Sequence, residues 1–369
     1  MLDAKRQKCD TRATELSDRC TLSKERFLIV TTMKNEGPFM LEWIAYNRAI
    51  GFDDFVIFTN DCADGTDEIA IRLEELGLGV HVDNNDRKIG KRGRELAPQR
   101  AALRRAPSTE QYANADWVIC ADADEFLNLR TGMTLSDLIA QSGPSDAISF
   151  CWKLFGNGMR RHYEDIPITE QFFDCAPEGR FTNFRGAGIK TLFRNNGAFA
   201  RMGVHRPYVK NHKSDDPNNP PQYDGITWRD SGGNATDPST VTWRSWKGFQ
   251  HDFARLHHYA IRSCDSFLVK RDRGRTNHVN MDQGQEYFDA MNTNYERDYS
   301  ILKNVPGMFA ELTKLKSDKV LNKLHAEAVE WHRAKIADIK SREDWGDFIE
   351  MTYSHRGQAR SAKKAKSSD

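Results

Sequence analysis

The amino-acid sequence predicts an α/β protein in which helices flank a wound, mostly parallel sheet, with a helical extension at the C-terminal end. Three observations lead to this prediction. Between residues 27 and 121, four short apolar runs alternate with segments of helical spacing, as in wound parallel sheets. The fourth run stops abruptly at three acids within four positions. From residue 283 onward, apolar residues recur mainly at helical spacing.

The first unit of this pattern is a strand, a loop and a helix. Residues 27–32 form an apolar, β-branched run typical of a buried strand. Residues 34–37 make the loop, and Pro38 stands where a helix accepts its first residue. Apolar residues then keep helical spacing until Gly51, which we expect to end the helix. The loop is a predicted ligand contact, because strand and helix ends converge there; a plain cap and turn is the alternative.

The unit then repeats, and two further strands follow it. Each apolar run is short and is closed by polar or glycine-containing turns, which favours strands joined by helices. The predicted elements are a strand over 55–59, a polar turn over 60–66, a helix over 67–76, a strand over 79–82, a helix with a cationic face over 99–105, and a strand over 117–121.

Acidic side chains gather directly after the strand at 117–121. Asp122 and Asp124 are separated by one small residue, and Glu125 follows. In open α/β sheets, ligands bind beyond the carboxyl ends of the strands, so a chain turning out of this strand can aim both aspartates into one crevice. Carboxylates suit Mg²⁺ or Mn²⁺, which keep open positions for substrate phosphates. The alternative is an ordinary solvated turn, in which Glu125 anchors the backbone N–H groups.

Composition limits the function classes. The 369 residues include 54 basic and 53 acidic side chains, a net charge of +1, which provides no overall field for nucleic acid. Seven scattered cysteines without a Cys-x-x-Cys pair indicate a reducing compartment rather than a disulfide framework or a zinc site. We find no apolar stretch long enough for a transmembrane segment and expect a cytoplasmic protein.

Several motifs together resemble a known family. They are Lys34-Asn-Glu-Gly37, Glu42-Trp-Ile-Ala-Tyr-Asn47, Asn60-Asp-x-x-Asp-Gly-Thr66 and Asp122-Ala-Asp-Glu-Phe126. In this order they resemble the family-2-type glycosyltransferases of the GT-A fold, and most closely the branch related to family 92. The resemblance is strong over about residues 27–150 and thinner to about 275.

The resemblance implies a nucleotide-sugar donor and a bound Mn²⁺ or Mg²⁺. It implies that Asp124 ligates the metal directly, whereas Asp122 contacts the ribose or a metal-bound water. A distal histidine often completes such sites, and His258 matches that position, with His257 as the alternative; a packed core histidine is the plain interpretation. The residues that would contact the nucleotide or its phosphates are Lys34, Asn35, Glu36, Asp61, Asp64, Gln99 and Arg100.

Downstream motifs are matched with gaps. Trp152 and Gly156 lie in a segment that resembles the family's sugar pocket, and Lys190 in a strand that returns to it, although Lys190 could simply be ion-paired. Glu170 is the candidate base for an inverting reaction, in a motif where glutamine replaces the family's arginine. Asp252 is its alternative. His205 could face the acceptor.

The predicted organisation has four parts. Residues 1–24 form a flexible arm, 25–280 the catalytic domain, 281–355 a helical extension, and 356–369 a basic disordered tail. The catalytic domain divides into a nucleotide-binding half (25–130) and an acceptor half (131–280), which contains a long loop at 211–247. The extension is expected to pack on the catalytic domain; a homo-oligomer surface or a peripheral contact with the inner face of the membrane are alternatives.

The resemblance and the acids after residue 121 therefore predict a metal-dependent, inverting glycosyltransferase. We expect it to move a sugar from a nucleotide diphosphate sugar, with UDP as the expected nucleotide, to a hydroxyl of a saccharide or glycoconjugate. One alternative is a nucleotidyltransferase, for which residues 34–37 are a poor phosphate loop. Another is a non-catalytic sugar- or partner-binding relative.

Overall fold

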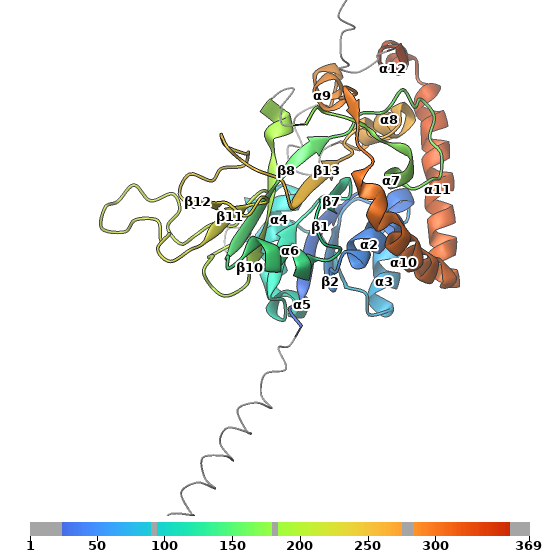
Figure 1. The fold of residues 1–369 in the computed structure, drawn as a ribbon. Coiled ribbons are helices and arrows are strands. Elements are labelled where there is room, and N and C mark those ends of the chain that lie inside the picture. Colours follow the sequence, from blue (N-terminus) through green and yellow to red (C-terminus); the bar gives the residue numbers. More distant parts are fainter. Residues whose placement is uncertain (1–23, 90–93, 179–183, 275–282, 355–369) are drawn as a thin grey trace, which may run out of the picture.

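A ten-stranded mixed sheet forms the centre of the part of the chain that the structure describes. The computed structural model describes residues 24–89, 94–178, 184–274 and 283–354. The strand order is β12-β11-β8-β10-β6-β1-β2-β3, and β7 and β13 join through β8. Figure 1 shows α2, α3, α10 and α11 gathered on one side of this sheet. The predicted arm, apart from Lys24, and the predicted basic tail lie outside the described residues.

The first half of the chain alternates strands and helices as predicted. Strands β6, β1, β2 and β3 pair in parallel and lie side by side. Helix α2 ends before Gly51, whose φ of +108° few other residues adopt. The elements are β1 (Phe27–Met33), α2 (Gly37–Ala49), β2 (Asp54–Thr59), α3 (Thr66–Glu75), β3 (Val80–Asp83), β4 (Lys88–Ile89), β5 (Arg94–Glu95), α4 (Pro98–Arg105), η1 (Ala106–Ser108), α5 (Glu110–Ala113) and β6 (Trp117–Cys120).

The parallel strands are buried on both faces. In β1, Phe27 and Ile29 pack into the core shared with α2 and α10, whereas Leu28 and Val30 pack into the core shared with α4 and α5. Successive side chains of a strand point to opposite faces, so a strand covered on both sides must be apolar throughout. This explains why the predicted strands are continuous apolar runs. The polar residues that follow β1 and β6 therefore stand beyond the carboxyl ends of these strands.

The second half adds strands of both directions. Strand β10 runs antiparallel to β6 and to β8, which confirms the strand expected around Lys190. Strand β13 lies between β7 and β8. The elements are β7 (Glu125–Leu129), α6 (Leu135–Ser142), β8 (Ala147–Leu154), α7 (Ile168–Gln171), β9 (Asp174–Cys175), η2 (Phe184–Ala187), β10 (Ile189–Arg194), β11 (Trp228–Asp230), β12 (Ala235–Thr236), β13 (Ala254–His258) and α8 (Cys264–Arg273).

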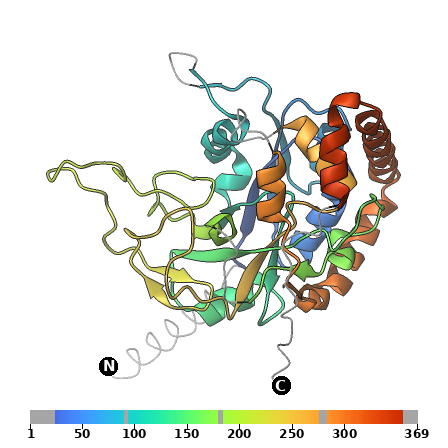
Figure 2. The ribbon, with the colours of Figure 1, turned by 90° about the horizontal axis from the view of Figure 1, so that it is seen from above.

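The segment 211–247, predicted as one long loop, contains two short strands. Strand β11 pairs in parallel with β8 and antiparallel with β12. Trp228 is buried against the sheet, and its Nε1 donates a hydrogen bond to Ser149 Oγ at 2.9 Å. Because this ring is buried against the sheet, the residues around it are held as a strand of the sheet rather than as a free loop. Part of the segment projects away from the body, in yellow-green in Figures 1 and 2, whereas Val241 is buried in the core.

The C-terminal part is helical, but its first predicted helix is shorter than expected. Tyr295 and Tyr299 have helical spacing with Tyr287, yet α9 ends at Met291. Instead, the side-chain oxygens of Asn292 and Asn294 accept hydrogen bonds from backbone N–H groups of the turn after β8, and the chain then pairs with β9. The elements are α9 (Gln285–Met291), β14 (Glu296–Arg297), η3 (Ser300–Asn304), α10 (Val305–Ser317), α11 (Lys319–Lys340), η4 (Glu343–Trp345) and α12 (Gly346–Ser354).

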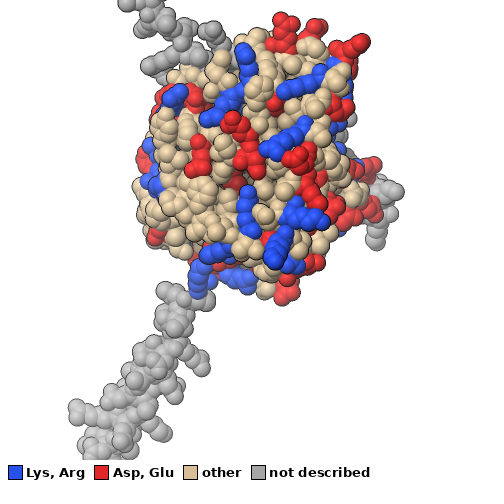
Figure 3. All heavy atoms as spheres, turned by 90° about the vertical axis from the view of Figure 1, so that its right-hand side faces the viewer, with Lys and Arg blue, Asp and Glu red and all other residues tan. Residues whose placement is uncertain are grey.

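Helix α10 packs against α2, and α11 packs against both α2 and α3. Arg48 of α2 pairs with Glu311 at 2.9 Å, and Arg72 of α3 pairs with Asp318 at 2.7 Å. Acidic and basic side chains are interspersed over this side of the molecule in Figure 3, with no broad region of one sign. No helix within the described ranges is both long and apolar enough to cross a bilayer.

Candidate active site

A cleft of about 1,110 Å³ opens at the carboxyl ends of β1 and β6. Strands and helices from both halves of the chain contribute to it. The predicted site residues that line it are Lys34, Glu36, Gln99, Arg100, Asp122, Asp124, Trp152 and His258. The structure thus brings together residues separated by more than two hundred positions, at the edge where the acids were expected.

Asp122 is held in place by a buried lysine. Lys190 Nζ lies 3.0 Å from Asp122 Oδ2 and 3.3 Å from Glu125 Oε2. Gln99 Nε2 donates to the other Asp122 oxygen at 2.7 Å. Burial would lower the pKa of Lys190, but Asp122 and Glu125 outweigh burial and raise it, so the ammonium stays charged. Lys190 is therefore the ion-paired lysine that the sequence left open.

Glu125 anchors the acidic turn, a role that the sequence left open. Its Oε2 accepts a hydrogen bond from the backbone N–H of Asp122 at 2.9 Å. Burial raises the pKa of Glu125 to about 7, although Lys190 opposes the shift. The carboxyl group does not line the cleft, so it shapes the turn that presents the two aspartates.

Asp124 points into the cleft beside a second lysine and a histidine. Lys270 Nζ donates to Asp124 Oδ2 at 2.6 Å, and His258 Nε2 lies 3.5 Å from Oδ1. Burial alone would raise the pKa of Asp124, but Lys270 and His258 hold it well below its usual range. Within the described residues, no three His, Cys, Asp or Glu side chains come together as a ready-made metal site. Asp124 is thus ionised, and its charge is offset by Lys270.

Glu36, in the loop after β1, forms ion pairs with two arginines. Arg262 Nη1 lies 2.8 Å and Arg273 Nη2 2.5 Å from its carboxylate oxygens. Arg273 also donates to the backbone oxygens of Lys34 and Asn35. Burial would raise the pKa of Glu36, but the two guanidinium groups outweigh it and lower the pKa. The loop after β1 is therefore tied to α8 and the turn before it.

Asn35, Asp61 and Asp64 do not line the cleft. Both carboxylate oxygens of Asp64 accept hydrogen bonds, from Gly37 N at 2.9 Å and from the N–H and hydroxyl of Thr66 at 3.0 and 2.6 Å. Asn35 Oδ1 accepts from Ala63 N at 2.8 Å. These side chains join the loops after β1 and β2. Their predicted contacts with a nucleotide stay predictions.

The expected sugar pocket is built from aromatic rings. Trp152 lies 4.5 Å from His258 and 5.7 Å from His205, and His205 lies 6.0 Å from Trp243, measured between ring centroids. Trp152, His205 and Trp243 all line the cleft. Gly156 does not, and a Cβ there would collide with Asn294, so this glycine serves close packing.

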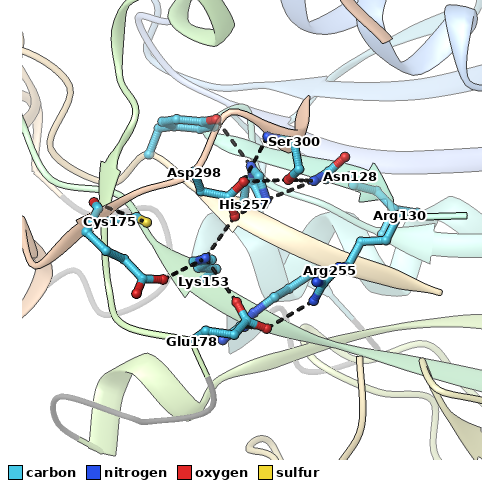
Figure 4. A network of polar contacts seen from close by, with 12 residues as sticks. Asn128, Arg130, Lys153, Cys175, Glu178, Arg255, His257, Asp298 and Ser300 are labelled. Atoms are coloured by element: carbon cyan, nitrogen blue, oxygen red, sulfur yellow. Dashed lines mark hydrogen bonds and ion pairs between the residues drawn. The ribbon is translucent and has the colours of Figure 1, made fainter. Parts of the chain in front are cut away.

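His257 faces away from the cleft into a polar network (Figure 4). Its Nε2 lies 3.1 Å from Asn128 Nδ2 and 3.8 Å from Asp298. Burial lowers the pKa of His257 to about 3. Neighbouring residues of a strand point to opposite faces, so only one of the two histidines of β13 can reach the aspartates. Of the two, His258 is the one beside Asp124.

Neither candidate for the catalytic base lies in the cleft. Glu170 is exposed on α7, whose first residues bond to Glu42 of α2 instead. Asp252 is exposed just before β13. Among the residues lining the cleft, the carboxylates are Glu36, Asp122 and Asp124, and each of them is engaged with a cation. The structure therefore gives no support to Glu170 or Asp252 as the base.

Comparison with known proteins identifies the family of the chain. The model of glycosyltransferase family 92 matches residues 30–223, more than half of the chain. The chain belongs to glycosyltransferase family 92. The matched segment of this family-92 protein includes the loops after β1 and β2, the aspartates after β6, and Trp152 and Lys190.

Two plant proteins of family 92 are similar to part of the chain. A family 92 protein of Ricinus communis is 28% identical over 119 residues, 32% of this chain and 20% of the relative. One of Oryza sativa subsp. japonica is 28% identical over 113 residues, 30% of this chain and 18% of the relative. The match thus spans about a fifth of the length of these curated relatives.

Solved structures show only a distant likeness. S. aureus TarS 1–349 gives a TM-score of 0.27 at 17% identity and covers 46% of this chain and 47% of its own. The same protein in complex with UDP gives 0.27 at 15% identity, covering 46% of each chain. A putative glucose-1-phosphate thymidylyltransferase from Bacillus anthracis gives 0.26 at 8% identity, covering 47% of this chain and 72% of its own.

Sequence reasoning did not assign a role to Lys270, Arg262 or Arg273. All three lie between residues 262 and 273, but their partners, Asp124 and Glu36, are far away in sequence. The available signal was the concentration of cations in and just before one short helix. Only the fold shows that this helix faces the acids.

Proposed function

We propose that the protein transfers a sugar from a nucleotide diphosphate sugar, expected to be UDP-linked, to a hydroxyl of a saccharide or glycoconjugate. The observation that carries the proposal is the cleft at the carboxyl ends of β1 and β6, in which a family 92 chain gathers Asp122, Asp124 and His258 with Lys34 and Gln99. This is the edge at which wound sheets bind nucleotides.

The loops around the cleft are suited to hold a donor without large rearrangement. Glu36 and Asp64 fix the loop after β1 from two sides, through α8 and through the turn after β2. Lys34 lines the cleft next to this loop and brings a positive charge for a diphosphate. Preorganised charge of this kind stabilises the leaving diphosphate better than mobile water does.

The residues present fit a divalent cation, Mn²⁺ or Mg²⁺, at Asp124. The carboxylate is ionised and faces the cleft, and the imidazole of His258 lies beside it. Such ions are commonly held by one or two carboxylates together with substrate phosphates, so a complete protein cage is not required. When bound, the cation supplies positive charge to the departing diphosphate. Asp122, which already bonds Gln99 and Lys190, is suited to a ribose or water contact.

The acceptor hydroxyl would lie against the rings of Trp152, His205 and Trp243. His205 Nδ1 lies 2.9 Å from the carbonyl oxygen of Ile189, so this nitrogen carries the proton and donates it. Burial, and then Lys190, lower the pKa of His205 to about 4, so the ring is neutral near pH 7. Its Nε2 can therefore accept a hydrogen bond from the acceptor and orient it for inverting displacement at the anomeric carbon.

The decisive experiment is a screen of nucleotide sugars for binding by calorimetry and for slow hydrolysis, with and without Mn²⁺. We expect a UDP-sugar to bind and to release UDP only when Mn²⁺ is present. Asp124→Asn should remove Mn²⁺-dependent turnover by at least about 100-fold while far-UV circular dichroism is unchanged. Asp347→Asn, on the exposed side of α12, is the matched control and should keep full activity.

Other outcomes would point to other functions. Full activity of Asp124→Asn would remove the metal role from this residue. Release of pyrophosphate instead of a nucleoside diphosphate would show a nucleotidyltransferase. If no nucleotide binds with or without Mn²⁺, the chain is a binding relative rather than an enzyme. Loss of turnover in Glu170→Gln would show that the acceptor reaches α7 after all.

A further inference from the structure

Four arginines from two distant segments form a cluster at the cleft. Arg100 and Arg104 lie on α4, and Arg201 and Arg206 lie in the segment between β10 and β11. We call these four residues the arginine cluster. Arg100, Arg104 and Arg201 line the cleft directly, as does Tyr208, whose ring contacts both Arg201 and Arg206.

The contacts within the cluster are unusual for arginines. The guanidinium carbon of Arg201 lies 4.1 Å from the centroid of the Tyr208 ring, and that of Arg206 lies 4.8 Å from it. Arg201 Nη2 lies 2.8 Å from His212 Nε2. Arg206 Nη1 is buried and has no hydrogen-bond partner within the described residues. An aromatic ring thus takes the place that a carboxylate usually fills.

The buried cations of the cleft region, unlike this cluster, are paired with carboxylates. Lys190 pairs with Asp122, Lys270 with Asp124, and Arg273 with Glu36. By contrast, no Asp or Glu of the described ranges lies within ion-pair distance of any member of the arginine cluster. Cations gathered without counter-charges repel one another, and an arrangement of this kind is stabilised when an anion binds.

The pKa of Arg201 is shifted in the direction that this repulsion favours. Burial lowers the pKa of Arg201, and Arg104, Arg100 and Arg206 lower it further, while Tyr208 opposes them. A guanidinium group presents a planar fork that matches the oxygens of a phosphate in a bidentate way. Phosphate is therefore the group that best fits several arginines facing one space.

We propose that the arginine cluster binds a phosphate group of the acceptor, so that the substrate class is a phosphate-bearing saccharide or glycoconjugate. This rests on the proposed function. The position of the cluster favours the acceptor over the donor, because Arg201 and Arg206 flank His205 in sequence. The ring of His205 packs against those of Trp152 and Trp243, which line the same cleft. An acceptor whose phosphate is bound by the arginine cluster would place a neighbouring hydroxyl against the rings of Trp152, His205 and Trp243.

The test uses the full chain and compares glucose 6-phosphate with glucose as probes, by calorimetry, in the presence of UDP and Mn²⁺. Glucose 6-phosphate should bind at least about tenfold more tightly than glucose, because charge-assisted bonds to phosphate add to the ring contacts. Arg104→Gln with Arg201→Gln should remove this preference and leave UDP affinity within about twofold. Both side chains are exposed, so the variant should fold.

Two controls keep the interpretation specific. Lys323→Gln with Arg333→Gln removes the same charge from exposed positions of α11 and should change neither affinity. Arg104→Lys with Arg201→Lys keeps the charge but loses the fork, and should retain only part of the preference for glucose 6-phosphate.

Equal affinity of the protein for glucose 6-phosphate and glucose would overturn the proposal. Competition between glucose 6-phosphate and UDP, with UDP affinity falling in the double glutamine variant, would also overturn it, since the cluster would then serve the donor. Failure of the proposed function looks different: no UDP or nucleotide sugar would bind. A preference for glucose 6-phosphate that persists without UDP would then show that the anion site stands independently of that function.

Discussion

Replacing Lys190 by methionine removes the only cation that contacts both Asp122 and Glu125 within the described residues. The ammonium lies 3.0 Å from Asp122 and 3.3 Å from Glu125, and the lysine side chain is fully buried. Methionine keeps the unbranched chain and much of its volume, so the change is chiefly electrostatic. It leaves Glu125 buried without a counter-charge, whereas Asp122 keeps some contact with solvent.

The expected loss follows from the cost of an uncompensated buried charge. At an effective dielectric constant near 20, two unit charges 3 Å apart attract by about 5 kcal/mol, and burying the lysine offsets part of this. Removing one partner of a buried pair typically costs about 3 to 5 kcal/mol. Since domains are stable by about 5 to 15 kcal/mol, the Lys190→Met protein should remain folded but be markedly less stable.

Urea unfolding followed by tryptophan fluorescence measures this loss. The double variant with Glu125→Gln should recover about half of it, because the buried carboxylate is neutralised as well. Lys335→Met is the matched control, since its ammonium is partly exposed and pairs with two carboxylates at the surface, where such pairs contribute about 1 kcal/mol or less. A loss below about 1 kcal/mol for Lys190→Met would refute the reasoning.

Three further changes test other parts of the site. Lys270→Met should bind Mn²⁺ several-fold more tightly in a paramagnetic resonance titration, because the ammonium lies 2.6 Å from Asp124 and competes for its charge. Glu178→Gln should differ less from the parent in its urea midpoint at pH 4 than at pH 6. Burial would raise the pKa of Glu178, but Arg255 and Lys153 lower it from 4.5 to about 2, so its stabilisation is present above pH 4.5 and is lost as the pH falls through 2. Gly188→Ala should lower the melting temperature by several degrees, because the added Cβ collides with the ring of Trp152.

Each of these predictions has a control and a contrary result. Unchanged Mn²⁺ affinity in Lys270→Met would mean that the ammonium and the ion do not share Asp124. Glu286→Gln, exposed on α9, should differ from the parent equally at both pH values, and the same behaviour in Glu178→Gln would contradict the assigned pairing. Gly346→Ala meets no atom within 4 Å and should be neutral or slightly stabilising, so a similar melting temperature for Gly188→Ala would speak against the close approach.

Interactions that are local in the chain were predictable. The runs around Ile29 and Ile119 are apolar throughout because they are covered on both faces, and this is visible without a structure. The position of Asp122 and Asp124 at the end of a strand follows from the same pattern. The helical spacing of residues 287–299 was misleading, because hydrogen bonds to the turn after β8 end α9 at Met291.

Choices between chemically similar residues depended on contacts across the fold. The family resemblance favoured His258 but left His257 open, because the two histidines are adjacent in the chain. The pleat of β13 sends one of them into the network of Asp298 and the other toward Asp124. Likewise, Glu170 has a family-like motif but stands on α7, outside the cleft.

The sequence alone predicted the wound sheet, its carboxyl edge and the acids placed there. This was possible because buried strands and amphipathic helices leave a local pattern of apolar and polar residues in the chain. Only the tertiary structure shows which lysines and arginines form ion pairs with those acids and which have no acidic partner among the described residues. Lys190 and Lys270 reach Asp122 and Asp124 from 68 and 146 positions away. Arg201, by contrast, meets an aromatic ring instead of a carboxylate. Electrostatic pairing depends on distance in space, which the order of residues does not encode.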